Sequence, residues 1–318
     1  MNVLVAGGTG FIGTNLCREL RDRGHDVTTL ARDPNPDSVP EGVETAVGDV
    51  SAYDSIVKTV AAQDAVVNLV ALSPLFEPPS GTSHEEVHLR GTENLVRAAE
   101  EGGVIRFVQM SNLSADPDSE LAYFRTKGKA ENVVRESDLE WTIFCPSVVF
   151  GEGDEFIEFT KLLTTPYLTA LPGGGENPFQ PIWVEDLAAM MADAVEDDRH
   201  VGKRYQIGGP EVLTMKQVTE LAYEAEGRPV TVLPIPMAMA KLGGILAGPV
   251  PFVPFGPDQI RSLKIDNTVA DNDVTAFGRT EDDLRTRTTS GSRGRGQDRN
   301  RHPRVTNRKP PDGHQPPA

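Results

Sequence analysis

The stretch AGGTGFIG, residues 6–13, follows the apolar run NVLVA at residues 2–6. It carries Gly7, Gly10 and Gly13 at G-x-x-G-x-x-G spacing. Glycines at these positions allow a tight turn after a strand, a close approach of the backbone to a pyrophosphate, and close packing of the following helix. The N-terminus of that helix then faces the anion. The stretch predicts a dinucleotide-binding turn, with a purely architectural turn as the alternative.

Apolar runs alternate with amphipathic stretches over the first 150 residues. Ile12, Leu16 and Leu20 recur every four residues, which is typical of a helix with one apolar face. Continuous apolar strands separated by such helices indicate a parallel sheet that is covered on both faces. The sequence therefore predicts an α/β fold with a Rossmann-type doubly wound parallel sheet in residues 1–150. The expected strands lie at residues 2–6, 27–30, 43–47, 65–72, 106–111 and 141–150.

After Gly151 the alternation loosens, and we expect residues 151–278 to form a small C-terminal lobe. Within it, IWVEDLAAMMADAVEDD at residues 182–198 has the pattern of a strand and a helix that return to the sheet. The apolar stretch 232–257 is interrupted by prolines and by Lys241, so it cannot cross a bilayer as one helix. We interpret it as the lining of a substrate cleft, with a partner-docking or membrane-surface patch as the alternative.

The formal charge of the 318-residue chain, −16 at pH 7, is unevenly distributed. Residues 279–318 carry twice as many basic as acidic side chains and almost no apolar ones, which predicts a disordered basic tail, native or produced by a frame shift. Residues 1–278 are strongly acidic, so we expect no nucleic-acid binding by this body. Its excess of acidic residues and shortage of lysine favour a halophilic source, with an ordinary acidic protein as the alternative.

A tyrosine and a lysine lie four residues apart in AYFRTKGKAE, residues 122–131. In a helix, Tyr123 and Lys127 share one face and lie one turn apart. An ammonium in that position can lower the pKa of a phenol, because it favours the charged form, and the phenol can then transfer protons near neutral pH. Two ordinary residues on a solvated helix are the alternative, since the spacing alone is a weak signal.

The residues after the second and third expected strands bear on the choice of dinucleotide. Ala31-Arg32-Asp33 follows the second strand, where alanine and arginine leave room and positive charge for a 2′-phosphate. We therefore favour NADP(H), while Asp33 keeps NAD(H) possible. Asp49 in VGDV can reach the adenine amine from the end of the third strand, and a loop-capping role is the alternative.

Several motifs together resemble one protein superfamily. AGGTGFIG, GDV, MSNLSAD and YFRTK are similar to motifs of the extended and atypical short-chain dehydrogenases/reductases. VVNLVAL, PSVVFGEGDEF, PFQPIWVEDLA, YQIGGPEVLT and PDQIRSLKIDN resemble the branch that contains the nucleotide-binding accessory subunit of respiratory complex I and its prokaryotic relatives. The resemblance covers residues 1 to about 278 and implies a Rossmann domain that binds NADP(H) or NAD(H), with a small C-terminal substrate lobe.

The resemblance also implies roles for individual residues. Tyr123 would be the acid/base, and Lys127 would hold the nicotinamide ribose and lower the pKa of the tyrosine. A serine after the fifth strand would orient the substrate oxygen; we choose Ser111, with Ser114 and Asn112 close by. The positions expected to contact the cofactor are Gly7, Gly10, Phe11, Ile12, Gly13, Arg32, Asp49, Val50, Leu69, Ala71 and Lys127.

The chain departs from the sugar-nucleotide epimerases of this superfamily after the fourth strand. A small His/Ala motif is usual there, whereas this chain has Leu69-Val70-Ala71-Leu72 followed by SPLFEPPSG. An apolar, proline-rich loop beside the nicotinamide suits a hydrophobic substrate, and a rigid structural loop is an equal alternative. His84 and His88 have a spacing that can bind metal, but no third ligand stands out, so we expect surface or packing residues and no metal.

Three functions remain open from the sequence. The first is an NADP(H)-dependent oxidoreductase that acts on a small apolar carbonyl, alcohol or quinone-like substrate. The second is a non-catalytic structural or assembly subunit of a respiratory NADH dehydrogenase, because the complex I relative is regarded mainly as structural. The third is a nucleotide-sugar epimerase or dehydratase. No signal peptide or membrane span is recognisable, so we expect a cytoplasmic protein, with the inner face of the membrane and a respiratory complex as the alternative location and partner.

Overall fold

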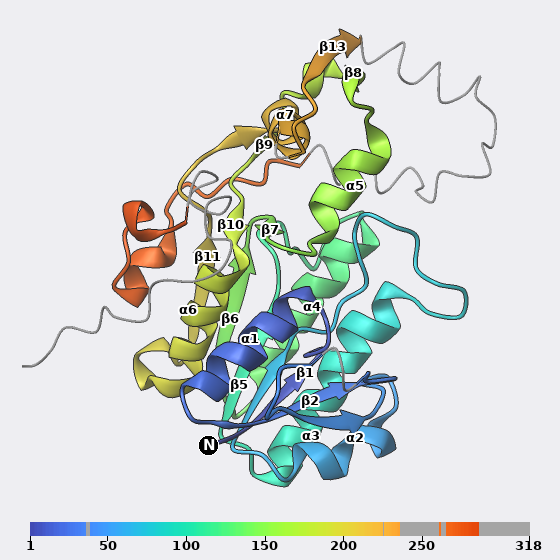
Figure 1. Ribbon diagram of the computed structural model, residues 1–318. Coiled ribbons are helices and arrows are strands. Elements are labelled where there is room, and N and C mark those ends of the chain that lie inside the picture. Colours follow the sequence, from blue (N-terminus) through green and yellow to red (C-terminus); the bar gives the residue numbers. More distant parts are fainter. Residues whose placement is uncertain (36–38, 225, 236–260, 262–264, 286–318) are drawn as a thin grey trace, which may run out of the picture.

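The strand β1 (Asn2–Ala6) lies inside a seven-stranded sheet whose neighbouring strands are all parallel. In the computed structural model, which describes residues 1–35, 39–224, 226–235, 261 and 265–285, the strand order is β11-β6-β5-β4-β1-β2-β3. The other strands are β2 (Asp26–Ala31), β3 (Glu44–Val47), β4 (Ala65–Asn68), β5 (Arg106–Met110), β6 (Glu140–Pro146) and β11 (Lys203–Ile207). The predicted α/β class and doubly wound parallel sheet are confirmed (Figure 1).

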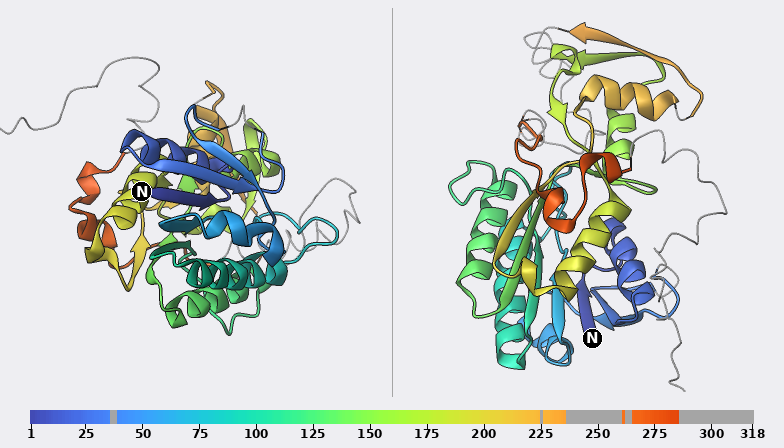
Figure 2. Two further views of the ribbon diagram at one scale, coloured as in Figure 1. Left: turned by 90° about the horizontal axis from the view of Figure 1, so that it is seen from below. Right: turned by 90° about the vertical axis from the view of Figure 1, so that its left-hand side faces the viewer.

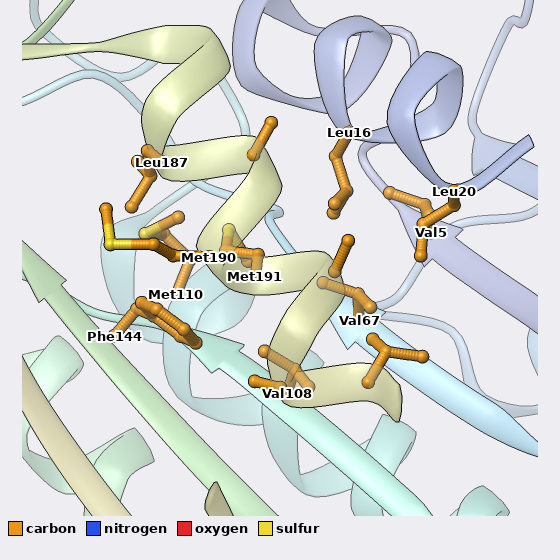
Figure 3. Close-up of a cluster of buried hydrophobic side chains, with 14 of the residues drawn as sticks. Val5, Leu16, Leu20, Val67, Val108, Met110, Phe144, Leu187, Met190 and Met191 are labelled. Atoms are coloured by element: carbon orange, nitrogen blue, oxygen red, sulfur yellow. The ribbon is translucent and has the colours of Figure 1, made fainter. Parts of the chain in front are cut away.

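Helices cover both faces of this sheet, as Figure 2 shows. One face is covered by α1 (Phe11–Asp22) and α6 (Val184–Glu196). The other face is covered by α2 (Tyr53–Val60), α3 (Gly91–Gly102) and α4 (Ala122–Glu136). In the first layer, Leu16 and Leu20 of α1 and Met190 of α6 pack over the strands, with no exposed surface (Figure 3). Burial of both sheet faces explains why the strands are continuous apolar runs.

Two expected strands end earlier than the sequence predicts. β4 stops at Asn68 and not at residue 72, because the Asn68 Oδ1 accepts the Val70 N–H at 3.1 Å and His88 Nε2 accepts the Leu72 N–H at 2.9 Å. The expected strand 141–150 is two strands. β6 stops at Pro146, and β7 (Val149–Phe150) pairs with β10 (Ile182–Trp183) outside the main sheet.

The chain returns to the sheet after leaving it, as the pattern at residues 182–198 predicts. β10 leads into α6, and β11 then pairs in parallel with β6, with Tyr205 opposite Phe144. This return places the last strand of the sheet after the part of the chain that forms the lobe helix α5 (Glu155–Leu163). Residues of the expected C-terminal lobe therefore contribute to both parts of the molecule.

The small lobe lies at one end of the sheet (Figure 1). It contains α5, α7 (Met215–Glu224) and two strand pairs, β8 (Tyr167–Pro172) with β13 (Val230–Ile235) and β9 (Pro178–Phe179) with β12 (Leu213–Thr214). Its apolar cluster consists of Leu75, Phe156, Phe159, Leu171, Phe179, Met215 and Val218. Leu75 belongs to the loop after β4, so this loop fastens the lobe to the sheet domain. Residues 236–257 of the predicted apolar stretch lie outside the described residues.

The disordered tail was predicted to begin at residue 279, which is too early. Residues 279–285 pack on the body: Thr280 and Asp283 form a capping box, Leu284 is buried in the cluster beneath α6, and the Arg285 N–H donates to Asp186 at 2.8 Å. One buried leucine holds this short polar segment on the body. The average composition of residues 279–318 does not reveal a contact made by a single residue. Residues 286–318 are outside the described part. None of the helices that the structure describes is both long and apolar enough to span a membrane.

Candidate functional site

The predicted cofactor residues converge at the carboxyl ends of the parallel strands. β1 lies between β4 and β2, so the chain winds away from it in opposite directions. In open parallel sheets the crevice at such a switch point, beyond the carboxyl ends of the strands, is where dinucleotides bind. Gly7, Arg32, Asp49 and Leu69 each directly or closely follow one of these strands.

The glycine turn has a backbone geometry that other residues would not allow. Gly7 has φ +83°, and its N–H donates to the Leu30 carbonyl at 2.9 Å. A Cβ on Gly13 would lie 2.3 Å from the Gly7 oxygen, so Gly13 lets α1 pack directly against the turn. A Cβ on Gly10 would meet only the Gly7 oxygen, at 3.3 Å, which leaves open space above it.

The N-terminus of α1 is suited to an anion. No side chain caps the helix at Gly10, so backbone N–H groups of the first turn keep their hydrogen-bonding capacity. Ile12 packs against the core, so its expected contact with a cofactor would come from the backbone. The residues present therefore fit a pyrophosphate group.

The adenosine end of the site contains both free and occupied side chains. Arg32 is exposed and forms no ion pair with any residue in the described part of the chain. Asp49 is half-buried, and its Oδ1 accepts the N–H and the hydroxyl of Ser51 at 2.9 and 2.7 Å. Val50 is buried, and its carbonyl accepts from Asn94 at 2.8 Å. Asp49 thus both caps its loop and keeps a second carboxylate oxygen for a ligand.

The segment after β4 forms the next part of the edge. The Leu69 N–H donates to the Ala6 carbonyl at 2.9 Å, which holds this segment beside β1. Ala71 is exposed, so its surroundings are open to a ligand. Farther along, Phe76 packs edge-on against Phe159 of the lobe with ring centroids 5.5 Å apart. The apolar loop is thus partly a structural link, which was one of the two expectations.

Tyr123 lies in the first turn of α4 and is half-buried. Its hydroxyl forms no hydrogen bond with the residues that the structure describes. His84 and His88 lie edge-on to its ring, with centroids 5.7 and 5.3 Å away. Burial raises the pKa of Tyr123 above its ordinary value, and the charge of Glu155 adds to the shift. This direction is opposite to the one expected from the Tyr–Lys spacing.

Lys127 lies one turn along the same helix and is 2% exposed. Its Nζ donates to the Met110 carbonyl at 3.0 Å, at the end of β5. Burial lowers the pKa of Lys127 to about 8, although the nearby Cys145 and Glu131 oppose the shift. The ammonium is therefore poised to lose its proton just above neutral pH. Tyr123 and Lys127 thus lie on one helix face, as predicted. Burial, and not an interaction between the two side chains, is the largest cause of both pKa shifts.

Ser111 occupies a different environment from the one its expected role requires. Its hydroxyl donates to Glu131 Oε1 at 2.6 Å, and both side chains are buried. Glu131 also accepts from Arg204 at 2.8 Å, so the serine belongs to a network that joins β5, α4 and β11. Of the alternatives, Ser114 is half-buried, and Asn112 has a buried Oδ1 that accepts no hydrogen bond from the residues the structure describes. The substrate-orienting role of Ser111 stays a prediction.

Two histidines lie in the site, although the sequence predicts only surface or packing positions for them. His88 is buried; its Nε2 accepts the Leu72 N–H, and its Nδ1 lies 3.0 Å from the Thr126 hydroxyl. Burial, reinforced by Lys127 and His84, lowers the pKa of His88 to about 2, so the ring is neutral. The described residues contain no group of His, Cys, Asp or Glu side chains that could hold a metal. The four-residue spacing was the available signal, but it does not reveal that both rings face Tyr123.

Comparisons with known proteins agree with this geometry. The sequence matches the family described as NAD(P)H-binding over residues 7–198. It is 31% identical to NADH dehydrogenase (ubiquinone) 1 alpha subcomplex subunit 9, mitochondrial, of Arabidopsis thaliana, over 84% of this chain and 71% of that protein. It is 28% identical to the 2-alkyl-3-oxoalkanoate reductase of Stenotrophomonas maltophilia, over 72% of this chain and 77% of the reductase.

A solved structure shares the fold. The UDP-glucose 4-epimerase of Thermus thermophilus, in complex with NAD, superposes with a TM-score of 0.62 at 22% identity, covering 84% of this chain and 97% of the epimerase. At this identity the likeness concerns the fold alone. The chain belongs to the NAD(P)H-binding family, in the extended branch of the short-chain dehydrogenase/reductase superfamily.

Proposed function

We propose that this protein is an NADP(H)-dependent oxidoreductase that acts on a small apolar carbonyl, alcohol or quinone-like substrate. The observation that carries the proposal is the position of Tyr123, whose hydroxyl is without a hydrogen bond in the described structure, one turn from the buried Lys127. A structural protein has no need to keep a phenol and an ammonium in this arrangement beside a dinucleotide turn.

Bound at the strand ends, a reduced nicotinamide supplies a hydride for a carbonyl carbon. Tyr123 donates the proton that the substrate oxygen takes up, and its raised pKa keeps the phenol protonated at neutral pH. Lys127 holds the nicotinamide ribose and, when charged, lowers the cost of forming the phenolate. With a pKa of about 8, Lys127 still carries its charge at neutral pH.

Two further features support the choice of cofactor and substrate. The exposed Arg32 at the end of β2 has no described ion-pair partner, so it is available for the 2′-phosphate of NADP(H). The loop after β4 is rich in apolar residues, which favours an apolar substrate. The relative named 2-alkyl-3-oxoalkanoate reductase, by its name, acts on a molecule with an alkyl and an oxo group.

A second candidate is a nucleotide-binding subunit of a respiratory complex, located at the inner face of the membrane. The specific observation is the 31% identity to a protein named as a subunit of NADH dehydrogenase. In this function a bound dinucleotide stabilises the fold, and Tyr123 has no proton to transfer.

Tyr123→Phe separates the two candidates, because it removes one oxygen and keeps the ring against His84 and His88. We expect NADPH oxidation with a panel of apolar ketones and quinones to fall by about 10² to 10⁴. NADP(H) affinity, measured by calorimetry, should hold. A wild-type protein that binds NADP(H) but reduces nothing in the panel would support the structural candidate.

A further inference from the structure

The expected third polar group of the site is committed to the fold. The Ser111 hydroxyl is only 2.6 Å from Glu131 Oε1, and Glu131 is 3% exposed. Glu131 also accepts from Arg204 and Arg135, both at 2.8 Å. Withdrawing the serine hydroxyl would remove the shortest of the hydrogen bonds that this buried carboxylate oxygen accepts, which costs free energy. Ser111 is therefore poorly placed to donate a hydrogen bond to a substrate oxygen.

His84 lies directly beside Tyr123. It immediately precedes the π-helix η2 (Glu85–Arg90), and it is half-buried. Its ring centroid is 5.7 Å from that of Tyr123 at an interplanar angle of 85°, and 5.0 Å from that of His88. His88 is itself fixed by the Leu72 N–H and the Thr126 hydroxyl. The His84 ring thus packs against a neighbour that is itself held by hydrogen bonds.

The two histidines differ in how their nitrogens are used. Both nitrogens of His88 have partners, whereas His84 makes no hydrogen bond to any residue in the described ranges, and its Nδ1 is buried. Burial closes the Nδ1 off from a ligand, whereas the Nε2 is not buried in this way, so it is the nitrogen that can meet a ligand. Burial and the charge of Lys127 lower the pKa of His84, so its ring is neutral at pH 7 and carries one N–H.

We propose that His84 is a further catalytic residue, whose Nε2–H donates to the carbonyl oxygen of the apolar substrate, in the role expected of Ser111. The inference rests on the proposed oxidoreductase function. The carbonyl carbon gains the hydride from NADPH, and the C=O π electrons move to oxygen. The oxygen takes the hydroxyl proton of Tyr123, and a proton from solvent water then restores the phenol. His84 transfers no proton and stabilises the charge that develops on the oxygen.

His84→Phe tests the role of the nitrogens, because it keeps an aromatic ring against Tyr123. With cyclohexanone and NADPH we expect kcat and kcat/KM to fall together by about 10²-fold, the usual effect of losing one donor to a developing oxyanion. NADPH affinity and the melting temperature should stay at wild-type values. His84→Gln retains an N–H donor and should recover part of the rate. Full wild-type rates in His84→Phe, with the loss appearing instead in Ser111→Ala or Asn112→Ala, would overturn the proposal.

A binding measurement supplies a readout that needs no turnover. The protein is labelled with ¹⁵N-histidine and mixed with NADP⁺ and cyclohexanone, which cannot react because the cofactor is oxidised. We expect the ring nitrogens of His84, assigned from the His84→Phe spectrum, to shift on ketone addition, while those of His88 stay in place. Unmoved His84 signals would overturn the proposal. A shift without turnover by wild-type protein would retain His84 as a ligand contact and overturn the oxidoreductase function.

Discussion

The glycine turn at residues 7–13 and the cluster around Tyr123 lie at the same edge of the sheet, but they are held by different kinds of contact. The turn consists of consecutive residues whose geometry is set by the backbone, such as the 2.3 Å between a Cβ on Gly13 and the Gly7 oxygen. The cluster joins side chains of separate segments, with His84 and His88 before α3 and Tyr123 on α4.

This difference decides which property each region can give to a ligand. The turn offers backbone N–H groups at a helix N-terminus, so its chemistry does not depend on pH. The cluster offers titratable groups whose pKa values follow from burial, as the lowered pKa of Lys127 and the raised pKa of Tyr123 show. Perturbing the backbone should therefore affect folding or cofactor binding, whereas perturbing the cluster should affect proton transfer and its pH dependence.

Gly13→Val should have the largest effect, because it places a side chain inside the packed turn. A Cβ would lie 2.3 Å from the Gly7 oxygen and 2.5 Å from the Gly8 Cα, and backbone atoms cannot move aside cheaply. We expect the free energy of unfolding, from urea titrations at matched salt, to fall by about 3 kcal/mol or more.

Gly10→Val is the matched substitution in the same turn. A Cβ there meets only the Gly7 oxygen at 3.3 Å, so the protein should fold and lose dinucleotide binding in calorimetry. Equal stability losses in both variants would break the distinction between the packed and the open side of the turn. Unchanged cofactor affinity in Gly10→Val would mean that the turn is only architectural.

The fold was predictable where one local signal was sufficient. Apolar runs and glycine spacing gave the parallel sheet and the turn at β1, because the backbone responds to them directly. The predicted end of β4 was wrong, since Asn68 and His88 accept hydrogen bonds from backbone N–H groups that would otherwise pair with a neighbouring strand. A side chain sixteen residues away, as His88 is from Leu72, leaves no trace in a local pattern.

The cluster around Tyr123 was only partly predictable for the same reason. The spacing of Tyr123 and Lys127 predicted their common helix face, and both lie on α4. The direction of the Tyr123 pKa shift could not be read from spacing, because it depends on how deeply the lobe and η2 bury the phenol. The spacing of His84 and His88 agrees with their ring centroids lying 5.0 Å apart, but their contact with Tyr123 joins η2 to α4 and is not visible in a local pattern.

Lys127→Met should have an intermediate effect, which appears in the pH dependence of stability. Burial lowers the pKa of Lys127 from an ordinary 10.5 to about 8. Between these values the unfolded chain binds a proton that the folded protein has released, so the free energy of unfolding rises with pH. We expect the wild type to gain up to about 3 kcal/mol relative to Lys127→Met between pH 8 and 10.5.

Lys129→Met is the control for this measurement. Lys129 lies on the same helix, but its side chain is 41% exposed and 3.9 Å from Glu85, so its removal should leave the pH profile unchanged. Parallel pH profiles for wild type and Lys127→Met would show that Lys127 stays charged in the fold, and the contrast between a backbone site and a burial-controlled site would lose its main support.

Arg32→Ala should have the smallest effect, and it tests a third kind of contact at the same edge. Arg32 is exposed and carries no described ion pair, so its loss should leave stability unchanged. Its guanidinium can form charge-assisted hydrogen bonds only with a ligand that has a 2′-phosphate. We expect NADP(H) binding to weaken by about 1.5–3 kcal/mol in calorimetry, and NAD(H) binding to stay the same.

Salt sharpens this last test, because an exposed charge pair is screened whereas backbone contacts are not. The preference of wild-type protein for NADP(H) should therefore shrink between low and molar salt, and Arg32→Ala should show no such change. Arg32→Lys keeps the charge but loses the planar fork, so it should retain part of the preference. Equal losses for NADP(H) and NAD(H) in Arg32→Ala would show that Arg32 does not read the phosphate. Selectivity would then have to come from another group near the adenosine ribose, such as the exposed Asp33, because the adenine that Asp49 is expected to contact is the same in both cofactors.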